Sequence, residues 1–504
     1  MAGLPSEKST ASFWHSEPSE FLLGHRTTPN LPPTADVVIV GSGITGASAA
    51  RFLSEDARAK DLSIVMLEAR EACWGATGRN GGHCQPLLFD STPDVAAFEV
   101  LNVNSIKSHI EQDSIPCEWR SLPGCRTFWT QPLADAALRE VQHLKQTAPD
   151  LGNAVTFISD VDKLRELRVN GAPAATLTAN AGSLWPYKYV AFILESLIKD
   201  EKLNLQTHAP VTSISSSSSS SKSRHELHTP RGSIAANHII LATNAYTPFL
   251  LPEFTSLIVP ERGVMTALLP PKHTPRLSTS FGFVGANGSP ASHDDYLNQR
   301  PLSSPSPSQP PEGAHLMFGG GASSATLPSL HCTDDSILDP GPVTYLQRAL
   351  PQLLLLGGPN EHADADATTS SSNDHELEAT HAWSGIWGTS RDRHPWVGEV
   401  PRRKGVWLAG GYSGHGMPNA GLCARAVVEM VLGAAVRREG EGETKGLPEG
   451  EMEKSDDVAE KLILTGDLPR AYMITSERME RARGMESVEA QYQKQRLAGG
   501  ERLV

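Results

Sequence analysis

The sequence has little positive charge, no long apolar run and no paired cysteines, and each absence excludes a class of protein. Its 504 residues carry a formal net charge of −13, whereas phosphate binding needs a basic surface. No stretch approaches the roughly 20 apolar residues that cross a bilayer, and no basic amphipathic stretch indicates attachment to a membrane. We therefore expect neither nucleic acid nor a membrane as a partner.

The termini and the cysteines favour a cytoplasmic enzyme. Residues 1–20 lack a cationic segment followed by an apolar core, and residues 501–504 (ERLV) do not form a peroxisomal signal. No CxxC pair occurs among the six cysteines, which are Cys73, Cys84, Cys117, Cys125, Cys332 and Cys423. We expect reduced, buried thiols and no metal site. The length favours two domains, and the sequence does not indicate the oligomeric state.

A strand, a glycine-rich turn, a helix and a second strand follow one another near the N-terminus. The apolar run Val37 to Val40 predicts a strand buried on both faces. A helical pattern follows from about Thr45 to Leu53, and a second apolar run, Leu62 to Leu67, ends at Glu68. This order predicts a βαβ unit that binds a dinucleotide.

The turn in this unit has GxGxxG spacing, and each glycine has a separate physical role. Gly41 permits the tight turn, Gly43 lets a pyrophosphate approach the backbone, and Gly46 lets helix and strand pack closely. The helix N-terminus offers free N–H groups to the phosphates. Glu68 is placed to accept a hydrogen bond from a ribose hydroxyl.

Three low-complexity stretches interrupt the rest of the chain. They are residues 213–223 (SISSSSSSSKS), 301–312 and 361–378, and we expect them to be surface insertions. Between them, residues 238–246, 259–269 and 314–322 have strand character, whereas residues 101–150 look helical. A helix is also expected around 475–483.

A second glycine-rich turn lies far along the chain. Residues 405–433 (GVWLAGGYSGHGMPNAGLCARAVVEMVLG) predict a strand, a glycine-rich turn and a long helix. Two such turns suit a flavoprotein, because one turn holds the diphosphate and the other presents a helix N-terminus to the flavin.

The chain resembles the D-amino-acid oxidase superfamily of FAD-dependent oxidoreductases. Within it, the sequence is similar to the glycine and sarcosine oxidase branch, and to members of the gamma-glutamylputrescine oxidoreductase type. The resemblance rests on DVVIVGSGITG with Glu68, GATGRNGGH (75–83), SLWPYKYVAFIL (183–194), ILATNAYT, PERGVM, the skeleton Thr389, Asp392, Pro395 and Gly398, and GVWLAGGYSGHGM.

The resemblance implies an α/β fold with a discontinuous Rossmann-type FAD-binding domain and a substrate domain with a mixed β-sheet. The FAD-binding domain is expected from residues 34–100, 181–250 and 383–434. Residues 101–180 and 251–382 form the substrate domain, residues 1–33 an N-terminal extension and residues 435–504 a polar C-terminal tail.

The resemblance also implies the residues that contact FAD. They are Gly41, Ser42, Gly43, Ile44, Thr45, Gly46, Glu68, Ala69, Arg70, Thr77, Gly78, Arg79, Asn80, Gly81, Gly82, His83, Thr243, Asn244, Gly414, His415, Gly416 and Met417. For Arg79 and Asn80 the alternative is that they tie their loop to neighbouring backbone.

His415, Arg393 and Trp387 are the candidate catalytic residues. His415 is expected to hydrogen-bond the flavin or contact the substrate, although a turn-capping role is the alternative. Trp387 and Trp383 form an apolar wall for the substrate or, alternatively, part of the core. Arg393 precedes His394 and Pro395 in the pattern of the gamma-glutamylputrescine type.

Departures from the family pattern bear on the chemistry. Where related enzymes attach FAD through a cysteine this chain has Gly385, and His83 is expected to be a neighbour of the flavin, so we expect non-covalent FAD. The arginine that clamps an α-carboxylate is missing before Thr389, which favours an amine without that group. Met417 and Pro418 replace a lysine of the oxidases, which leaves oxidase and dehydrogenase both open.

The function expected from the resemblance is oxidation of a C–N bond in a small amine or amino acid. Hydride transfer to the flavin gives an imine that hydrolyses. Two alternatives stay open. One is a tailoring flavoenzyme of specialised metabolism, and the other is an FAD-binding scaffold without activity.

Overall fold

The computed structural model describes residues 3–216, 225–272, 274–288, 294–301, 314–358, 376–440 and 455–497. The three stretches expected as surface insertions lie mostly outside these residues. Only 213–216, 301 and 376–378 of them are described.

Strands and helices alternate through much of the chain. The strands are β1 (Thr34–Val40), β2 (Ile64–Leu67), β3 (His83–Cys84), β4 (Arg120–Phe128), β5 (Val155–Ile158), β6 (Ala174–Ser183), β7 (Asn204–Gln206), β8 (Ser213–Ser216), β9 (His225–Thr229), β10 (Gly232–Leu241), β11 (Ile258–Leu268), β12 (Ser280–Val284), β13 (Asp295–Gln299), β14 (Leu316–Gly320), β15 (Ala379–Ser390), β16 (Trp396–Glu399) and β17 (Val406–Gly410). The α-helices are α1 (Ile44–Glu55), α2 (Pro93–Gln112), α3 (Gln131–Thr147), α4 (Pro149–Asn153), α5 (Val161–Glu166), α6 (Pro186–Lys199), α7 (Thr247–Leu250), α8 (Pro340–Leu353), α9 (Ala420–Gly440), α10 (Ser455–Thr465), α11 (Ser476–Gly484) and α12 (Val488–Leu497).

The first sheet has the strand order β16-β17-β10-β1-β2-β7; β9 pairs with the N-terminal half of β10, and β8 pairs with β9. Strand β1 pairs in parallel with both β2 and β10. Its side chains alternate between two cores: Val37 and Ile39 face the core that holds α1, α6 and α9, whereas Val38 and Val40 face the other side. This alternation explains why the strand reads as an unbroken apolar run.

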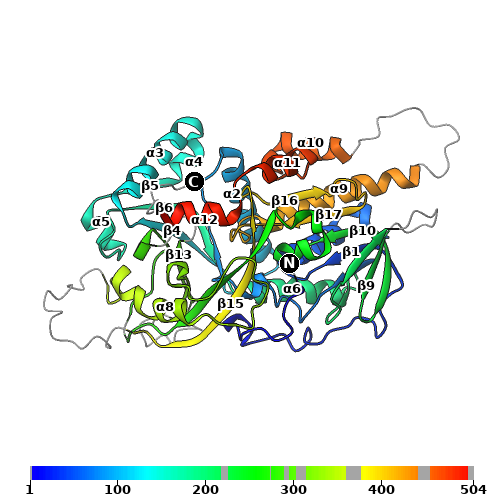
Figure 1. The fold of residues 1–504 in the computed structure, drawn as a ribbon, viewed down its shortest axis with the longest axis horizontal. Helices are drawn as coiled ribbons and strands as arrows, with labels where there is room; N and C mark the ends of the chain where they lie inside the picture. The colour runs from blue at the N-terminus through cyan, green and yellow to red at the C-terminus, as the bar shows by residue number, and fades with distance from the viewer. Residues whose placement is uncertain are drawn as a thin grey trace.

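The second sheet has the order β15-β11-β14-β13-β12-β4-β6-β3, with β5 beside β6. Helix α8 packs on one face through Leu346, Leu350 and Leu353. Helix α3 packs on the other face through Leu133 and Val141. Figure 1 shows the two sheets side by side along the long axis, with β1, β10 and β17 on the right and β4, β6 and β13 on the left.

The predicted α/β class is confirmed, with a dinucleotide-type unit in the parallel part of the first sheet and a mixed second sheet. The βαβ unit forms as β1, α1 and β2. The helical prediction for 101–150 is wrong between α2 and α3, where β4 lies. Pro123 and Gly124 are residues that are unfavourable inside a strand, so the sequence did not indicate β4. The pairing of β4 with β6 shifts register between Leu122 and Gly124.

Strand pairing bears on the expected domain boundaries. Strand β15, which includes residues 383–390 of the predicted FAD-binding domain, pairs with β11 along its whole length and so lies in the second sheet. The short β3 also joins the second sheet. The domain boundaries stay predictions.

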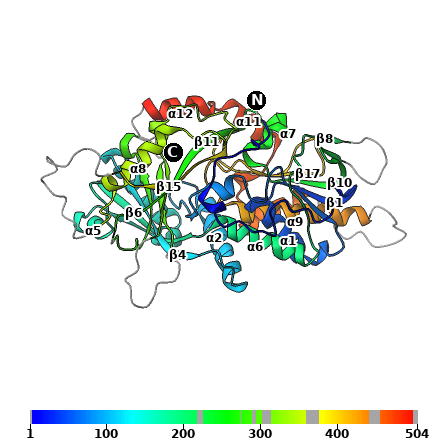
Figure 2. The same ribbon diagram turned by 90° about the horizontal axis from the view of Figure 1, so that it is seen from below.

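The described part of the predicted C-terminal tail folds back onto the molecule. Figure 2 shows α11 and α12 on the same side of the molecule as β11. The backbone N–H of Ile474 donates to the carbonyl of Val397 at 3.0 Å, beside the edge strand β16. The tail therefore contributes buried contacts as well as a polar surface.

Candidate functional site

The first glycine-rich turn joins β1 to α1 and has the shape that the motif requires. Gly41 has φ of +104°, and a Cβ at Gly46 would lie 1.9 Å from the carbonyl oxygen of Gly41. Gly43 precedes α1 and provides no side-chain cap. The N–H of Ile44 donates to the hydroxyl of Thr77 at 3.0 Å, and the first turn of α1 presents the positive end of the helix dipole to the cavity, a site for an anion.

Glu68 lies at the carboxyl end of β2 beside this turn. Its Oε2 accepts hydrogen bonds from the backbone N–H and the hydroxyl of Ser42, at 3.0 and 2.6 Å. Its Oε1 accepts from the N–H of Arg70 at 3.0 Å. These bonds hold the carboxylate at the edge of the sheet, where the motif places the ribose of a dinucleotide.

One cavity of about 460 Å³ connects this turn with the second sheet. Most predicted site residues line it: Gly41, Ser42, Gly43, Ile44, Thr45, Glu68, Ala69, Arg70, Thr77, Arg79, Asn80, Gly81, His83, Thr243, Asn244, Trp387, Gly414, His415, Gly416 and Met417. Four do not line it: Gly46, Gly78, Gly82 and Arg393.

Gly46, Gly78 and Gly82 pack against protein instead. A Cβ at Gly78 would lie 2.3 Å from both the carbonyl oxygen of Cys73 and Nε2 of His15. Gly82 has φ of +69°, and a Cβ there would lie 2.4 Å from the carbonyl of Leu184. Because these glycines have no side chain, neighbouring segments of the protein can pack closely against them, behind the residues that line the cavity.

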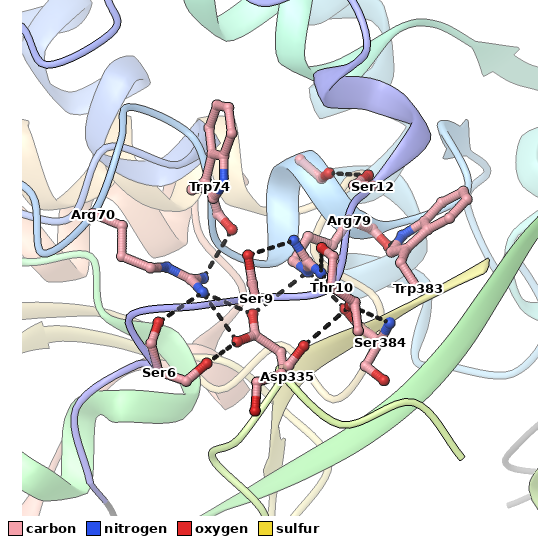
Figure 3. A network of polar contacts seen from close by, with 12 residues as sticks. Ser6, Ser9, Thr10, Ser12, Arg70, Trp74, Arg79, Asp335, Trp383 and Ser384 are labelled. Atoms are coloured by element: carbon pink, nitrogen blue, oxygen red, sulfur yellow. Dashed lines mark hydrogen bonds and ion pairs between the residues drawn. The ribbon is translucent and has the colours of Figure 1, made fainter. Parts of the chain in front are cut away.

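Arg79 and Arg70 share one buried carboxylate, Asp335, in a network that includes the N-terminal extension (Figure 3). Nη1 of Arg70 lies 2.9 Å from Asp335 Oδ2, and Nε of Arg79 lies 3.5 Å from the same atom. Arg79 also donates to the hydroxyl of Thr10 at 2.7 Å and to the carbonyl of Ser384 at 2.6 Å. Burial lowers the pKa of Arg79 to about 10, against the attraction of Asp335.

These contacts match the alternative role considered for Arg79 and Asn80, that of tying the loop to its neighbours. Asn80 donates to the carbonyl of Thr77 at 3.1 Å and accepts from the N–H of Gly82 at 2.7 Å. Both residues nevertheless border the cavity. Their roles toward the cofactor stay predictions.

His83 is held neutral beside the cavity. It lies on β3, and its Nε2 is 2.7 Å from the hydroxyl of Ser280. Burial, with a smaller contribution from His415, lowers its pKa to about 3. Among the residues that the structure describes, no cysteine lines the cavity.

The second glycine-rich turn follows β17 and leads into α9. Gly411, Ser413 and Gly414 have φ of +73°, +52° and +82°. Oδ1 of Asn244 accepts the N–H of Gly411 at 2.9 Å, which ties this turn to the segment after β10.

The long helix α2 also holds the second turn. Nδ2 of Asn102 donates to the carbonyl of Met417 at 3.0 Å, and Oδ1 accepts the N–H of Leu422 at 2.8 Å. The N-terminus of α9 is thereby fixed against the cavity, where Met417 and Ala420 are lining residues.

His415 forms an ion pair that the sequence did not reveal. Its Nε2 lies 3.2 Å from Oε2 of Glu99, which is 3% exposed on α2. Burial alone lowers the pKa of His415, but the charge and hydrogen bond of Glu99 outweigh burial and the pKa is raised. Glu99 is 316 residues away in sequence, so no local pattern could have identified it.

Arg126 on β4 is a second cavity residue that the sequence did not reveal, because its region was read as helical. Its guanidinium pairs with Asp90 and lies 3.4 Å from Asp294. Both Arg126 and Asp294 line the cavity. The guanidinium thus has two carboxylate neighbours.

Trp387 and Arg393 occupy different surroundings. Trp387 lines the cavity from β15, above Gly263, where a Cβ would lie 2.1 Å from the indole. Arg393 donates through Nε to Gln491 at 3.1 Å and faces Tyr492 of α12. Trp383 is fully buried and donates to the carbonyl of Arg79 at 2.8 Å, which matches its alternative role in the core.

The part of the chain that the structure describes contains no cluster of three or more His, Cys, Asp or Glu able to hold a metal ion. Within the same residues, no helix combines the length and apolar character needed to cross a membrane.

The residues present fit FAD. The N-terminus of α1, a close-packed glycine turn and Glu68 line the cavity, and the second glycine-rich turn lines it as well. These are the groups that a diphosphate, a ribose and an extended ring system require.

Comparison with known proteins gives consistent results. The chain is 22% identical over 420 residues to the probable oxidoreductase OrdL of Haemophilus influenzae, covering 79% of this chain and 83% of that protein. It is 23% identical over 427 residues to gamma-glutamylputrescine oxidoreductase of Escherichia coli, covering 81% and 86%.

Solved structures share the fold. Glycine oxidase from Geobacillus kaustophilus has a TM-score of 0.59 at 20% identity, covering 82% of this chain and 96% of that one. L-amino acid deaminase from Proteus myxofaciens has a TM-score of 0.60 at 14% identity, covering 86% and 96%. Residues 36–430 match the DAO family, described as FAD dependent oxidoreductase. The chain therefore belongs to the DAO family of FAD-dependent oxidoreductases.

Proposed function

We propose that the protein oxidises a C–N bond in a small amine at the second-sheet end of its cavity, with non-covalent FAD at the other end. The observation that carries this proposal is the single cavity, which is lined both by the dinucleotide-type turn and by polar residues of the second sheet. Bound FAD supplies the acceptor for the two electrons that leave the substrate carbon as a hydride.

The reaction balances as a loss of two hydrogens from the amine. The carbon adjacent to nitrogen gives up a hydride, the nitrogen gives up a proton, and a C=N bond forms. Water then adds to the imine, which splits into a carbonyl compound and a smaller amine or ammonia. The amine must react in its neutral form, and a cavity shielded from water favours that form.

The chain's own residues would bind and orient the substrate. Nε2 of His415 is held by Glu99, which leaves Nδ1 for a ligand. Trp387 offers an apolar surface on the same cavity. The turn before α9, whose Gly414, Gly416 and Met417 line the cavity, would lie beside the ring of the cofactor, with the positive end of the α9 dipole behind it, where negative charge develops on reduction.

The arginines that line the cavity favour an amine without a neighbouring carboxylate. Arg70 and Arg79 pair with Asp335, and Arg126 pairs with Asp90 and Asp294. Arg262 donates to the carbonyl of Pro328 at 3.1 Å. Since each guanidinium already has a protein partner, a substrate carboxylate would have to displace one of these contacts.

A substrate survey tests the proposal. The FAD-loaded protein would be mixed with an artificial electron acceptor and with matched amines that carry or lack an α-carboxylate. We expect carbonyl product from amines that lack it, at rates at least about tenfold above those of their amino-acid counterparts, since a lost charge pairing of this kind costs more than a factor of ten. A preference for amino acids would contradict the substrate assignment, and no product from either set would favour a binding scaffold.

A further inference from the structure

The C-terminal residues beyond the family match reach into the core of the molecule. The match ends at residue 430, whereas Tyr472, between α10 and α11, is only 1% exposed. Met473 bridges in parallel to Val397 of β16. Residues 472–474 therefore extend the edge of the first sheet close to the second glycine-rich turn.

Arg478 of α11 fastens this segment. Its guanidinium donates to both oxygens of Asp392 at 2.8 and 3.0 Å, and to the carbonyl of Tyr472 at 2.7 Å. It also lies 3.8 Å above the ring of Trp396. Because Arg478 is 3% exposed, these charge-assisted bonds hold the segment in one place.

A continuous chain of hydrogen bonds runs from Tyr472 to the cavity. The hydroxyl of Tyr472 donates to Oδ1 of Asn419 at 2.8 Å. Nδ2 of Asn419 donates to Oε1 of Glu99 at 2.9 Å. Oε2 of Glu99 lies 3.2 Å from Nε2 of His415, which lines the cavity.

The amide of Asn419 can satisfy its neighbours in only one orientation. Its Nδ2 also donates to the carbonyl of His415 at 3.0 Å. Were the amide reversed, its oxygen would face both that carbonyl and the Glu99 carboxylate, and all three are acceptors. The Tyr472 hydroxyl supplies the donor that the observed orientation needs.

Several titratable groups face His415 from the elements around it. Glu99 approaches from α2, Arg126 from β4, Asp294 from the segment before β13, and His83 from β3. Of these groups, Glu99 hydrogen-bonds the ring, at 3.2 Å. Its position, which Asn419 shares in holding, therefore has the strongest effect on the imidazole.

We propose that the C-terminal extension is a working part of the site, and that Tyr472 is a positioning residue which fixes the orientation and hydrogen bonding of His415 through Asn419 and Glu99. The extension is then more than a surface addition. It completes a chain of contacts that begins outside the family match and ends at the cavity.

Titration of His415 tests this proposal without any substrate. Holoenzyme with isotope-labelled histidine would be followed by NMR across pH, and the signal of His415 assigned by its loss in His415→Gln. In Tyr472→Phe we expect the pKa of His415 to fall by about 0.5 unit or more, because a loosened Glu99 stabilises the charged ring less. Glu99→Gln gives the reference for full loss of the charge and lowers it further.

The matched control is Tyr189→Phe. Tyr189 is another buried tyrosine whose hydroxyl bonds a polar side chain, His109, at 3.0 Å. It should leave the pKa of His415 unchanged. A folded Tyr472→Phe variant that titrates like this control overturns the proposal.

A second variant keeps the test decisive if Tyr472→Phe does not fold. Asp392→Asn weakens the hold of Arg478 on the segment and should lower the pKa of His415 in the same direction by a smaller amount. An unchanged titration in this folded variant overturns the proposal equally.

A consequence for catalysis rests on the proposed function. In Tyr472→Phe, the pH profile of kcat/KM should move with the pKa of His415, whereas in Tyr189→Phe it should not. If no amine is oxidised, the proposed function fails while the titration result stands. If amines are oxidised but the titration is unchanged, only the positioning role fails.

Discussion

The hydroxyl oxygens of Thr45 and Tyr412 lie 3.0 Å apart, and this contact joins the two glycine-rich turns across 367 residues of sequence. Thr45 belongs to the first turn of α1, and Tyr412 follows β17. Both side chains are buried and both line the cavity. The two ends of the expected cofactor site are thus coupled directly.

A double-mutant cycle measures this coupling. We expect Thr45→Val and Tyr412→Phe to interact by about 1 kcal/mol in the free energy of unfolding, because each removes the same hydrogen bond. Chemical denaturation of the wild type, both single variants and the double variant gives the value. Strictly additive effects would show that the contact contributes nothing.

Gly46→Ala is expected to destabilise the protein by about 1–3 kcal/mol, because the added methyl group meets the carbonyl of Gly41. It should also weaken FAD binding, since the helix must move away from the turn. Gly484→Ala is the control, because a Cβ there has no heavy atom within 4 Å. Equal effects of the two substitutions on denaturation midpoints would contradict the close-packing role.

Asp335→Asn removes the one carboxylate that Arg70 and Arg79 share. We expect a loss of about 3–5 kcal/mol of stability, because two guanidinium groups stay buried without their counter-charge. Removal of Glu460, which pairs with Arg470 on the surface, should leave stability unchanged. If Asp335→Asn behaved like Glu460→Gln, the buried network would not fasten the N-terminal extension.

Glu261 gives a pH-dependent prediction. Burial raises its pKa from 4.5 to about 7, although the hydrogen bond from Thr389 and the charge of Arg393 oppose this. The folded state therefore binds the proton more tightly than the unfolded state, so stability falls as pH rises from about 4.5 to about 7.

In Glu261→Gln this fall should shrink by up to about 3 kcal/mol, the equivalent of the pKa difference. Unfolding free energies at several pH values, compared with the wild type, measure it. Asp295 also has a pKa raised to about 7, but it is present in both the wild type and Glu261→Gln, so its contribution to the pH dependence cancels in the comparison. Parallel curves for the two proteins would mean that Glu261 does not titrate as described.

Local sequence patterns could predict the turn at the proposed cofactor end of the cavity because its geometry is local. Gly41, Gly43 and Glu68 fall within one βαβ unit, and their spacing determines their geometry. The strand before the second turn was predicted for the same reason. Even there, the pattern could not tell that Gly78 and Gly82 face protein atoms, since those neighbours come from distant segments.

The proposed substrate end of the cavity could not be predicted in the same way. Arg126 lies on β4, where Pro123 and Gly124 are unfavourable in a strand and so obscured its prediction. Glu99 lies within α2, and the sequence pattern of that helix does not mark it out from the other acidic residues. Arg393 was expected in the site by resemblance, but the C-terminal helix α12 contacts it through Gln491. Such pairings depend on how sheets and helices pack, which no short motif records.

The most direct test of the account is the absorption of the bound flavin during anaerobic mixing with a small amine that lacks a carboxylate. The account predicts that the protein purifies with FAD, or takes it up, that acid denaturation releases the flavin, and that the amine bleaches its visible absorption with release of a carbonyl product. A protein that does not bind FAD, or a bound flavin that stays coloured with every amine and amino acid tried, would contradict it.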